Sequence, residues 1–254
     1  MSFTVVMHSE SIDTGASLDT IAAVTDQHIT TEGDDVVVPE RYSKLIGVYA
    51  VGVDISRVRM NSPSLRRTLL LDCPNFDINA VPESENPPSF NDLTRSPIQL
   101  DPSEGLRAEV INDGASASRV DVLSFLGGEL RPIPEGRIET VRLTGTTTLT
   151  ANAWTLVNLT LSQQLPKGRY AVVGARFESA GAVAGRLVLQ NADNRPGCVA
   201  RDSAEDVDIP MFRRGGLGWI WGEFDHRYSP QAEFFSSSAD TAETVYLDII
   251  KIGE

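Results

Sequence analysis

The chain has 254 residues, of which 41% are hydrophobic and 22% are charged. This composition is typical of a folded globular protein, and the length suits either one large domain or two of about 125 residues. The formal net charge of −13 at pH 7 argues against a protein whose main task is to grip nucleic acid, because such binding needs a basic surface.

The N-terminal segment is acidic. The first forty residues hold eight acidic residues and no lysine or arginine, so this end carries no basic arm for packaging a genome. The opening MSFTVVMHSESID lacks the basic and apolar regions of a secretion signal, and no apolar run reaches the ~18–20 residues of a membrane span. We therefore expect a chain that is made and used without secretion. Residues 17–27 carry the best helical spacing and predict a short helix, with Leu18, Ile21 and Ala22 on one face.

The rest of the chain reads as short strands. Residues 105–111 alternate strictly between apolar and polar side chains, which predicts a half-buried strand. Residues 169–177 and 245–252 are apolar on both faces. Such strands fit sheets that pack a core on one side and a neighbour on the other. Eight strands are expected in the second half, over 138–143, 146–150, 154–162, 168–178, 182–190, 218–224, 232–236 and 244–252.

Proline and glycine mark the expected loops and domain boundary. The proline-rich stretch 74–102 predicts a long excursion loop, and 191–217 predicts a second one. The segment GGELRPIPEGR at 127–137 lies at the midpoint and has the composition of a linker. We therefore predict a first domain over 1–127, a linker over 128–137 and a second domain over 138–254.

A weak internal repeat favours two similar domains over one. Each half ends in a strand with a single aspartate, Asp121 or Asp248, preceded by a turn of small residues. Each half also runs from an apolar strand through an arginine-bearing strand to a proline-containing turn and then a cysteine, Cys73 or Cys198. Chance similarity between two β-domains is the alternative interpretation, because turn residues recur everywhere.

The sequence predicts no catalytic, cofactor-binding or metal-ligating residue. No phosphate-binding loop, dinucleotide fingerprint or GxSxG elbow occurs. The three histidines, His8, His28 and His226, are not clustered as a histidine-ligated centre requires. The two cysteines form no CxxC and are expected to be buried or inert thiols.

Two features of the sequence are compatible with a bound ligand. The loop 202–208 offers four carboxylates in seven residues, which suits a structural calcium ion, although a solvated acidic loop is the alternative. Aromatic residues crowd the region 219–235, where they form either the inner face of a sandwich or a platform for sugar rings. These aromatic residues are Trp219, Trp221, Phe224, Tyr228, Phe234 and Phe235.

Taken together, the pattern resembles the double jelly-roll major capsid proteins of icosahedral, membrane-containing viruses, the lineage of tectiviruses and corticoviruses. The segments that carry the resemblance are LPKGRYAVVGARFESAGAVAGRLVLQ (165–190), NADNRPGCVA (191–200), RRGGLGWIWGEFD (213–225), ETVYLDIIKIGE (243–254) and, less closely, KLIGVYAVGVDISRVRMNSPSLRR (44–67).

The resemblance implies an all-β chain of two tandem eight-stranded antiparallel jelly rolls. It further implies a homotrimer with a pseudo-hexagonal outline that tiles the virion shell with neighbouring capsomers and other virion proteins. The protein would be made in the host cytoplasm, with an internal membrane beneath the shell and no sequence-specific contact with nucleic acid. We also expect residues 1–40 to order only on assembly.

Three other functions remain open from the sequence. A carbohydrate-binding β-sandwich would use Trp219 or Trp221 to stack on sugars. A phage tail or fibre component would form elongated trimers. A glycosidase or lyase on a β-scaffold would need a catalytic acid that the sequence does not single out, and fold alone does not decide between such functions.

Overall fold

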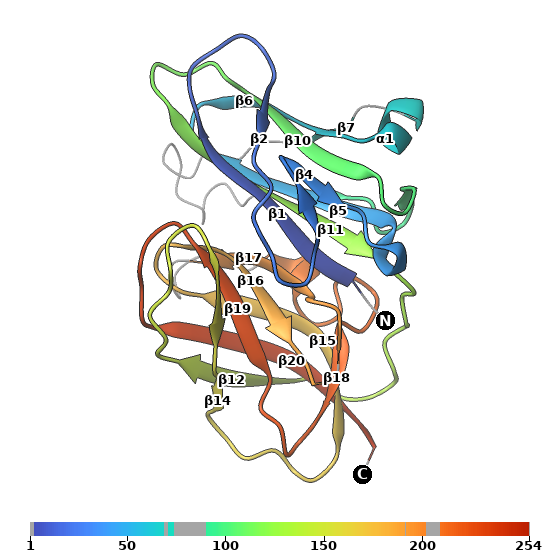
Figure 1. Ribbon diagram of the computed structural model, residues 1–254. Coiled ribbons are helices and arrows are strands. Elements are labelled where there is room, and N and C mark those ends of the chain that lie inside the picture. Colours follow the sequence, from blue (N-terminus) through green and yellow to red (C-terminus); the bar gives the residue numbers. More distant parts are fainter. Residues whose placement is uncertain (1–2, 69–70, 74–89, 191, 202–208, 254) are drawn as a thin grey trace. The chain divides into compact units, whose positions relative to one another are not determined.

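The computed structural model describes residues 3–68, 71–73, 90–190, 192–201 and 209–253 (Figure 1). The fold is all-β. The described residues add one short helix, α1 (Pro63–Thr68), and two 3-10 turns, η1 (Glu40–Tyr42) and η2 (Pro210–Phe212). The chain divides into two compact units. The N-terminal unit is Val6–Gly128, and the C-terminal unit is Glu129–Glu254 together with the first residues of the chain up to Val5.

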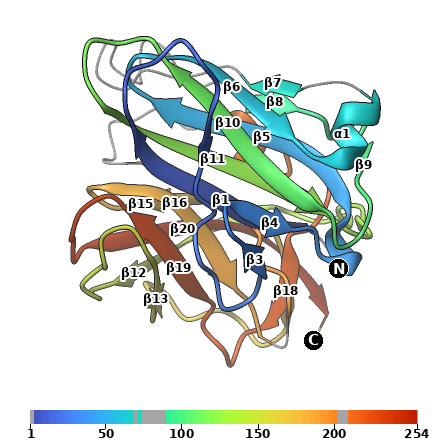
Figure 2. The same ribbon diagram turned by 45° about the horizontal axis from the view of Figure 1, so that its top comes forward.

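The N-terminal unit contains two sheets. One has the order β1-β11-β5-β8, with β9 also paired to β5, and the other has the order β3-β4-β10-β6-β7, with β2 also paired to β10 (Figures 1 and 2). Its strands are β1 (Phe3–Ile12), β2 (Asp19–Ile21), β3 (Thr31–Glu32), β4 (Asp35–Val37), β5 (Lys44–Gly52), β6 (Ile55–Asn61), β7 (Leu71–Cys73), β8 (Phe90–Asp92), β9 (Ile98–Gln99), β10 (Gly105–Asn112) and β11 (Ser118–Gly127).

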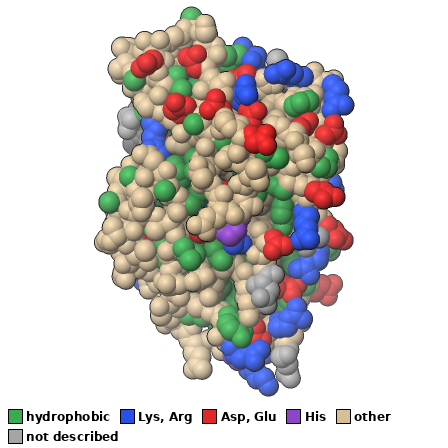
Figure 3. Space-filling model, in the orientation of Figure 1, with side chains coloured by type: hydrophobic (Ala, Val, Ile, Leu, Met, Phe, Trp, Pro, Cys, Tyr) green, Lys and Arg blue, Asp and Glu red, His purple; other side chains and the backbone are tan. Residues whose placement is uncertain are grey.

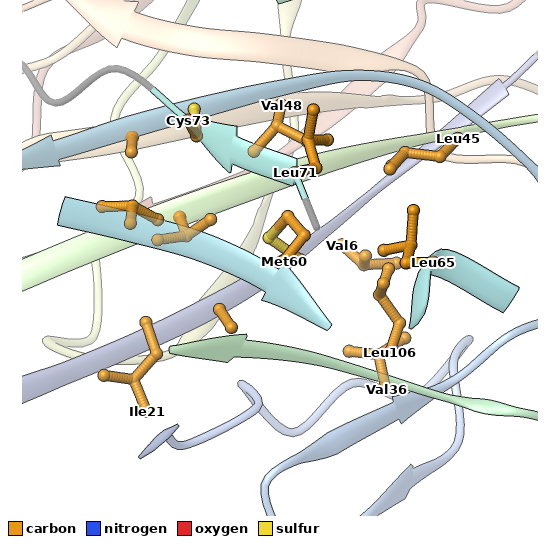
Figure 4. Close-up of a cluster of buried hydrophobic side chains, with 14 of the residues drawn as sticks. Val6, Ile21, Val36, Leu45, Val48, Met60, Leu65, Leu71, Cys73 and Leu106 are labelled. Atoms are coloured by element: carbon orange, nitrogen blue, oxygen red, sulfur yellow. The ribbon is translucent and has the colours of Figure 1, made fainter. Parts of the chain in front are cut away.

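The core of the N-terminal unit lies between these two sheets, as in a β-sandwich. Strand β10 shows why the sequence folds this way, because its burial alternates at every residue and confirms the strand predicted at 105–111. Its buried side chains Leu106, Ala108 and Val110 belong to the same apolar cluster as Val48 of β5. Figure 4 shows the labelled members of this cluster converging from several strands.

The C-terminal unit contains nine strands in one connected array. The order is β13-β19-β16-β17-β15-β20-β12-β14, with β18 also paired to β15. The strands are β12 (Glu139–Gly145), β13 (Trp154–Val157), β14 (Thr160–Leu161), β15 (Arg169–Glu178), β16 (Ala182–Val188), β17 (Gly197–Arg201), β18 (Gly222–Asp225), β19 (Gln231–Ser236) and β20 (Glu243–Gly253). The only parallel pairing among these strands is the two-residue contact of β15 with β17, which joins two otherwise antiparallel sheets.

The apolar strands predicted at 169–177 and 245–252 are confirmed as β15 and β20, which pair along their length. Their inner face contributes Phe177, whose ring meets Phe234 of β19 edge-on at 5.7 Å. Their other face carries Val173 and Ile250, which form a small second cluster with Ile220. We expected a neighbouring subunit on that face, but Ile133 and Ile220 of the same unit pack there.

Both units follow the same strand order. If β2–β4 count as one position and β8–β9 as another, the strands of the N-terminal unit alternate as 1-8-3-6 in one sheet and 2-7-4-5 in the other. In the C-terminal unit, β12-β20-β15-β18 and β13-β19-β16-β17 give the same two orders, with β14 as an addition beside β12. The loose sequence repeat therefore corresponds to a repeat of topology.

The helix predicted at 17–27 is wrong. Residues Asp19–Ile21 form β2, and Ile21 pairs with Ala108 of β10 and is buried in the apolar core. Pairing with an existing strand outweighs weak helical spacing over one short stretch. The helix of this unit instead begins at Pro63, where the Ser62 hydroxyl accepts a hydrogen bond from the Leu65 amide at 3.1 Å.

Several strand and loop predictions need correction. The strand predicted at 154–162 is split, because β13 pairs with β19 whereas β14 pairs with β12. Residues 146–150 form no strand. The predicted loop 191–217 contains β17, and the end of the predicted loop 74–102 contains β8 and β9, which add to the edge of β5. Residues 74–89 lie outside the described residues.

The N-terminal segment also differs from expectation. Its described part forms β1 to β4, and β2 and β4 pair with β10 of the same chain. That residues 1–40 order only on assembly stays a prediction. Phe3–Val5 belong to the C-terminal unit rather than to the predicted first domain. The cause lies in their contacts, which are described below.

Candidate functional site

The described part of the chain holds no side-chain cluster with the make-up of a metal centre. Within it, no group of three or more His, Cys, Asp or Glu side chains is close enough to hold a metal ion. His28 is exposed, whereas His8 is fully buried and its Nε2 lies 3.1 Å from the Leu106 carbonyl oxygen. The acidic loop 202–208, considered for calcium, lies outside the described residues. None of the described helices has the length and apolar character needed to cross a membrane.

The most specific side-chain chemistry lies on the last strand of each unit, at the two aspartates of the sequence repeat. Asp121 of β11 accepts a hydrogen bond from the Ser9 hydroxyl of β1 at 2.6 Å. Asp248 of β20 accepts one from the Thr140 hydroxyl of β12, also at 2.6 Å. In both units the last strand is therefore tied to the first by the same carboxylate–hydroxyl bond.

Asp248 is fully buried. Its carboxylate also accepts hydrogen bonds from Arg213 Nε at 2.9 Å and from the backbone amide of Arg214 at 2.7 Å. Burial by itself raises the pKa of this carboxyl, but the bonds from Arg213, Thr140 and Arg214 outweigh it and lower the pKa below the ordinary value. Asp248 is therefore an ionised aspartate inside the fold, with its charge balanced by Arg213.

Gly174 makes this arrangement possible. It lies opposite Asp248 on the neighbouring strand β15. A Cβ at this position would lie 2.8 Å from the Phe212 carbonyl oxygen and 2.9 Å from the Arg214 nitrogen. Only glycine lets the segment 212–214 lie so close to the sheet, and that segment supplies Arg213 to Asp248.

Asp121 obtains its balancing charge locally. Arg119, two residues earlier on the same strand, donates from Nε and Nη2 at 2.9 and 3.0 Å. The same guanidinium also donates to Ser9 Oγ at 3.0 Å. Val51 lies opposite Asp121 on the neighbouring strand β5, whereas Gly174 holds the equivalent position in the C-terminal unit.

The start of the chain is anchored within the C-terminal unit. The Phe3 ring is buried and meets Trp221 edge-on at 5.2 Å. The Val5 amide donates to the Arg195 carbonyl oxygen at 2.9 Å, and Asn194 Nδ2 donates to the Trp221 carbonyl oxygen at 3.0 Å. The sequence carries only a weak signal of this anchor, an apolar FTVV run inside an acidic segment.

A buried charge cluster lies beside this anchor. Arg186 of β16 donates to Glu233 of β19, its cross-strand partner, at 2.5 Å. Its guanidinium also lies 4.0 Å from the centre of the Trp154 ring, within the range of a cation–π contact. Arg186 is almost fully buried. Nothing in the sequence around it distinguishes it from an arginine at the surface.

The aromatic cluster at 219–235 is mostly interior. Trp219, Trp221, Phe224, Phe234 and Phe235 are all buried, so they form no platform for sugar rings. Tyr228 is the exception, with 47% of its surface exposed.

Both cysteines, Cys73 and Cys198, are buried and neither forms a disulfide. Burial raises the pKa of the Cys73 thiol to about 12, which makes it unreactive as a thiolate while the protein is folded.

On the face drawn in Figure 3, acidic and basic side chains lie side by side.

Comparisons with known proteins give a limited result. No protein-family model matches the chain, and curated proteins likewise give no match. Among solved structures, the chain is similar to the major capsid protein P2 from bacteriophage PM2. That likeness has 11% sequence identity, covers 97% of this chain and 98% of that one, and has a TM-score of 0.24. Because a TM-score of this size does not establish a common fold, the functional interpretation depends on the chain's own strand order and contacts.

Proposed function

We propose that this protein is a structural major capsid protein with two tandem jelly rolls, which assembles as a pseudo-hexagonal homotrimer. The observation that carries the proposal is the strand order 1-8-3-6 and 2-7-4-5 in both units. A double sheet of eight strands in two interleaved Greek keys defines the jelly roll, an architecture common in viral capsids. Two of them in one chain would give a trimer six barrels and hence a six-sided outline.

The side chains at the equivalent positions support a scaffold role. The two aspartates, Asp121 and Asp248, have hydrogen-bond partners that tie strands together, and side chains held in this way stabilise the fold rather than transfer protons. A non-enzymatic role follows from this interpretation.

The proposal includes the partners expected from the sequence. These are neighbouring capsomers and other virion proteins, with a membrane beneath the shell and the virion as the location. The net charge of −13 suits a shell whose genome lies behind another layer, since direct packaging of nucleic acid needs cationic side chains.

The test is the mass and outline of the purified full chain. Light scattering coupled to gel filtration should give about three times the chain mass of 27.6 kDa, and negative-stain images should show six-sided particles. Elongated trimers would favour a fibre component instead. Monomers across the accessible concentration range would overturn the proposal, because an obligate trimer interface buries enough apolar surface to persist on dilution.

A further inference from the structure

A groove of about 880 Å³ opens where three adjacent strands of the C-terminal unit meet their loops. Strand β13 ends there, β16 ends there, and β19 begins there. Its lining is a mixture of amides, hydroxyls, short apolar side chains and the charged side chains of Asp193, Arg195 and Arg227, from the segments 158–159, 188–190, 192–195 and 227–231. None of these residues takes part in the aspartate ties or the N-terminal anchor, apart from Arg195.

The groove holds the exposed aromatic ring left over from the cluster at 219–235. Tyr228 lines it and is 47% exposed, and its ring lies 5.8 Å from the Arg227 guanidinium. The turn that carries it is firmly held, since the Tyr228 amide donates to the Asp225 carbonyl oxygen at 2.9 Å. An exposed tyrosine on such a turn presents a flat apolar face and a polar tip to a ligand.

Polar side chains line the same groove as Tyr228. Gln231 Nε2 donates to Asn158 Oδ1, which orients both amides at the groove wall. Ser229 Oγ donates to the Leu159 carbonyl oxygen at 2.8 Å. Fixed amides beside an exposed aromatic ring provide the two contacts that a sugar needs, a stacking face for its C–H groups and in-plane bonds for its hydroxyls.

The charges of the groove are largely balanced. Arg227 Nε donates a hydrogen bond to Asp225 Oδ1 at 2.7 Å. This bond, together with the one from the Arg227 backbone amide, lowers the pKa of Asp225 to about 2. Arg195 is buried and donates from Nη1 to the Ala192 and Asn194 carbonyl oxygens. A groove whose arginines are already paired is suited to a neutral ligand rather than to an anion.

We propose that this groove binds a neutral oligosaccharide, with one pyranose ring stacked on Tyr228 and hydroxyls bonded to the Asn158 and Gln231 amides. The proposal does not depend on trimer formation, so the two can fail separately.

The test uses the full chain and three neutral probes, cellotetraose, maltotetraose and chitotetraose, with saturation-transfer NMR and calorimetry. At least one should bind, and Tyr228→Ala should weaken it about tenfold, the loss expected for one ring contact. Tyr228→Phe should retain most of the affinity because the stacking face remains. Leu156→Ala is the matched control, since Leu156 is as exposed (48%) and is not part of the groove lining.

Three outcomes would overturn the proposal. The first is that none of the three probes binds. The second is that Tyr228→Ala and Leu156→Ala change the affinity equally. The third is preferential binding of a sulfated oligosaccharide with strong dependence on salt, which identifies an anion site instead. Unchanged far-ultraviolet circular dichroism of each variant checks that it is folded.

Discussion

The two units place an aspartate at the same position of the same strand order and balance its charge in different ways. In the N-terminal unit, the partner of Asp121 is Arg119, two residues away on the same strand. In the C-terminal unit, the partner of Asp248 is Arg213, which comes from the segment between β17 and β18. The residue opposite the aspartate follows this difference, since it is Val51 in one unit and Gly174 in the other.

The two units therefore share one strand order but balance the charge of the aspartate in different ways. Val51 lies opposite Asp121, whose charge is balanced by Arg119 from within the same strand. Gly174 admits the remote segment 212–214, which brings Arg213 and the Arg214 amide to Asp248. The charge of Asp121 is therefore balanced locally, whereas the charge of Asp248 is balanced through a tertiary contact.

The two units can be followed separately in solution. All three tryptophans, Trp154, Trp219 and Trp221, belong to the C-terminal unit, so tryptophan fluorescence reports on that unit. Cys73 is buried in the N-terminal unit, so its labelling in a Cys198→Ala background reports on the opening of that unit.

The largest expected effect is from Asp248→Ala. This change leaves Arg213 in a largely buried position without its partner, and loss of one member of a buried pair costs about 3–5 kcal/mol. Urea denaturation followed by tryptophan fluorescence measures the loss. Asp121→Ala is the matched change and should cost less, because 30% of the Arg119 side chain is exposed and keeps its hydration. Equal losses at the two sites would contradict the comparison.

The next effect concerns the anchor at the start of the chain. Phe3→Ala removes a buried ring from its contact with Trp221, and such a truncation costs about 3 kcal/mol or more in a core. The tryptophan-detected transition of the C-terminal unit should move to lower urea. If only the labelling of Cys73 accelerates while the tryptophan transition stays in place, then Phe3 belongs functionally to the other unit.

A pH effect is expected from the buried His8 of the N-terminal unit. Burial lowers the pKa of His8 from 6.5 to about 4, with the Leu106 carbonyl and the charges of Asp35, Asp34 and Arg107 acting on it as well. The unfolded chain then binds a proton that the folded one does not, so the stability contributed by neutral His8 is complete above pH 6.5 and falls as the pH drops toward 4. The full loss is about 3 kcal/mol.

Urea midpoints from circular dichroism between pH 7 and pH 4 measure this loss, with His8→Asn as the reference. Subtracting the reference removes the contribution of the carboxylates common to both proteins. A wild-type curve parallel to that of His8→Asn would show that His8 takes up its proton in the folded state.

The smallest effect is expected from a change at Gly174, the glycine that lies opposite Asp248 in the C-terminal unit. Gly174→Ala should push segment 212–214 away from β15 and cost about 1–3 kcal/mol, measured by tryptophan fluorescence. Gly253→Ala is the control, because a Cβ there meets nothing within 4 Å. If both substitutions are neutral, the close approach at Gly174 does not hold Arg213 in place.

Much of the strand content can be predicted from local sequence patterns. Alternation predicts β10, and continuous apolar runs predict β15 and β20, because side-chain periodicity is a local property of a strand. The repeat placed Asp121 and Asp248 at equivalent positions before any contact was known. The loop predictions failed at β8 and β9, which pair with the distant strand β5, and at β17, which pairs with the preceding strand β16.

Only the tertiary structure decided which partners those residues have. Nothing near Asp248 in sequence indicates Arg213, 35 residues away, and nothing near Phe3 indicates Trp221. The same holds for the aromatic cluster at 219–235. Tyr228 is exposed and the other five aromatic residues are buried, although nothing in the sequence separates them. The physical reason is that pairing and burial depend on what the rest of the chain brings to a residue, whereas the sequence around it records only its local preference.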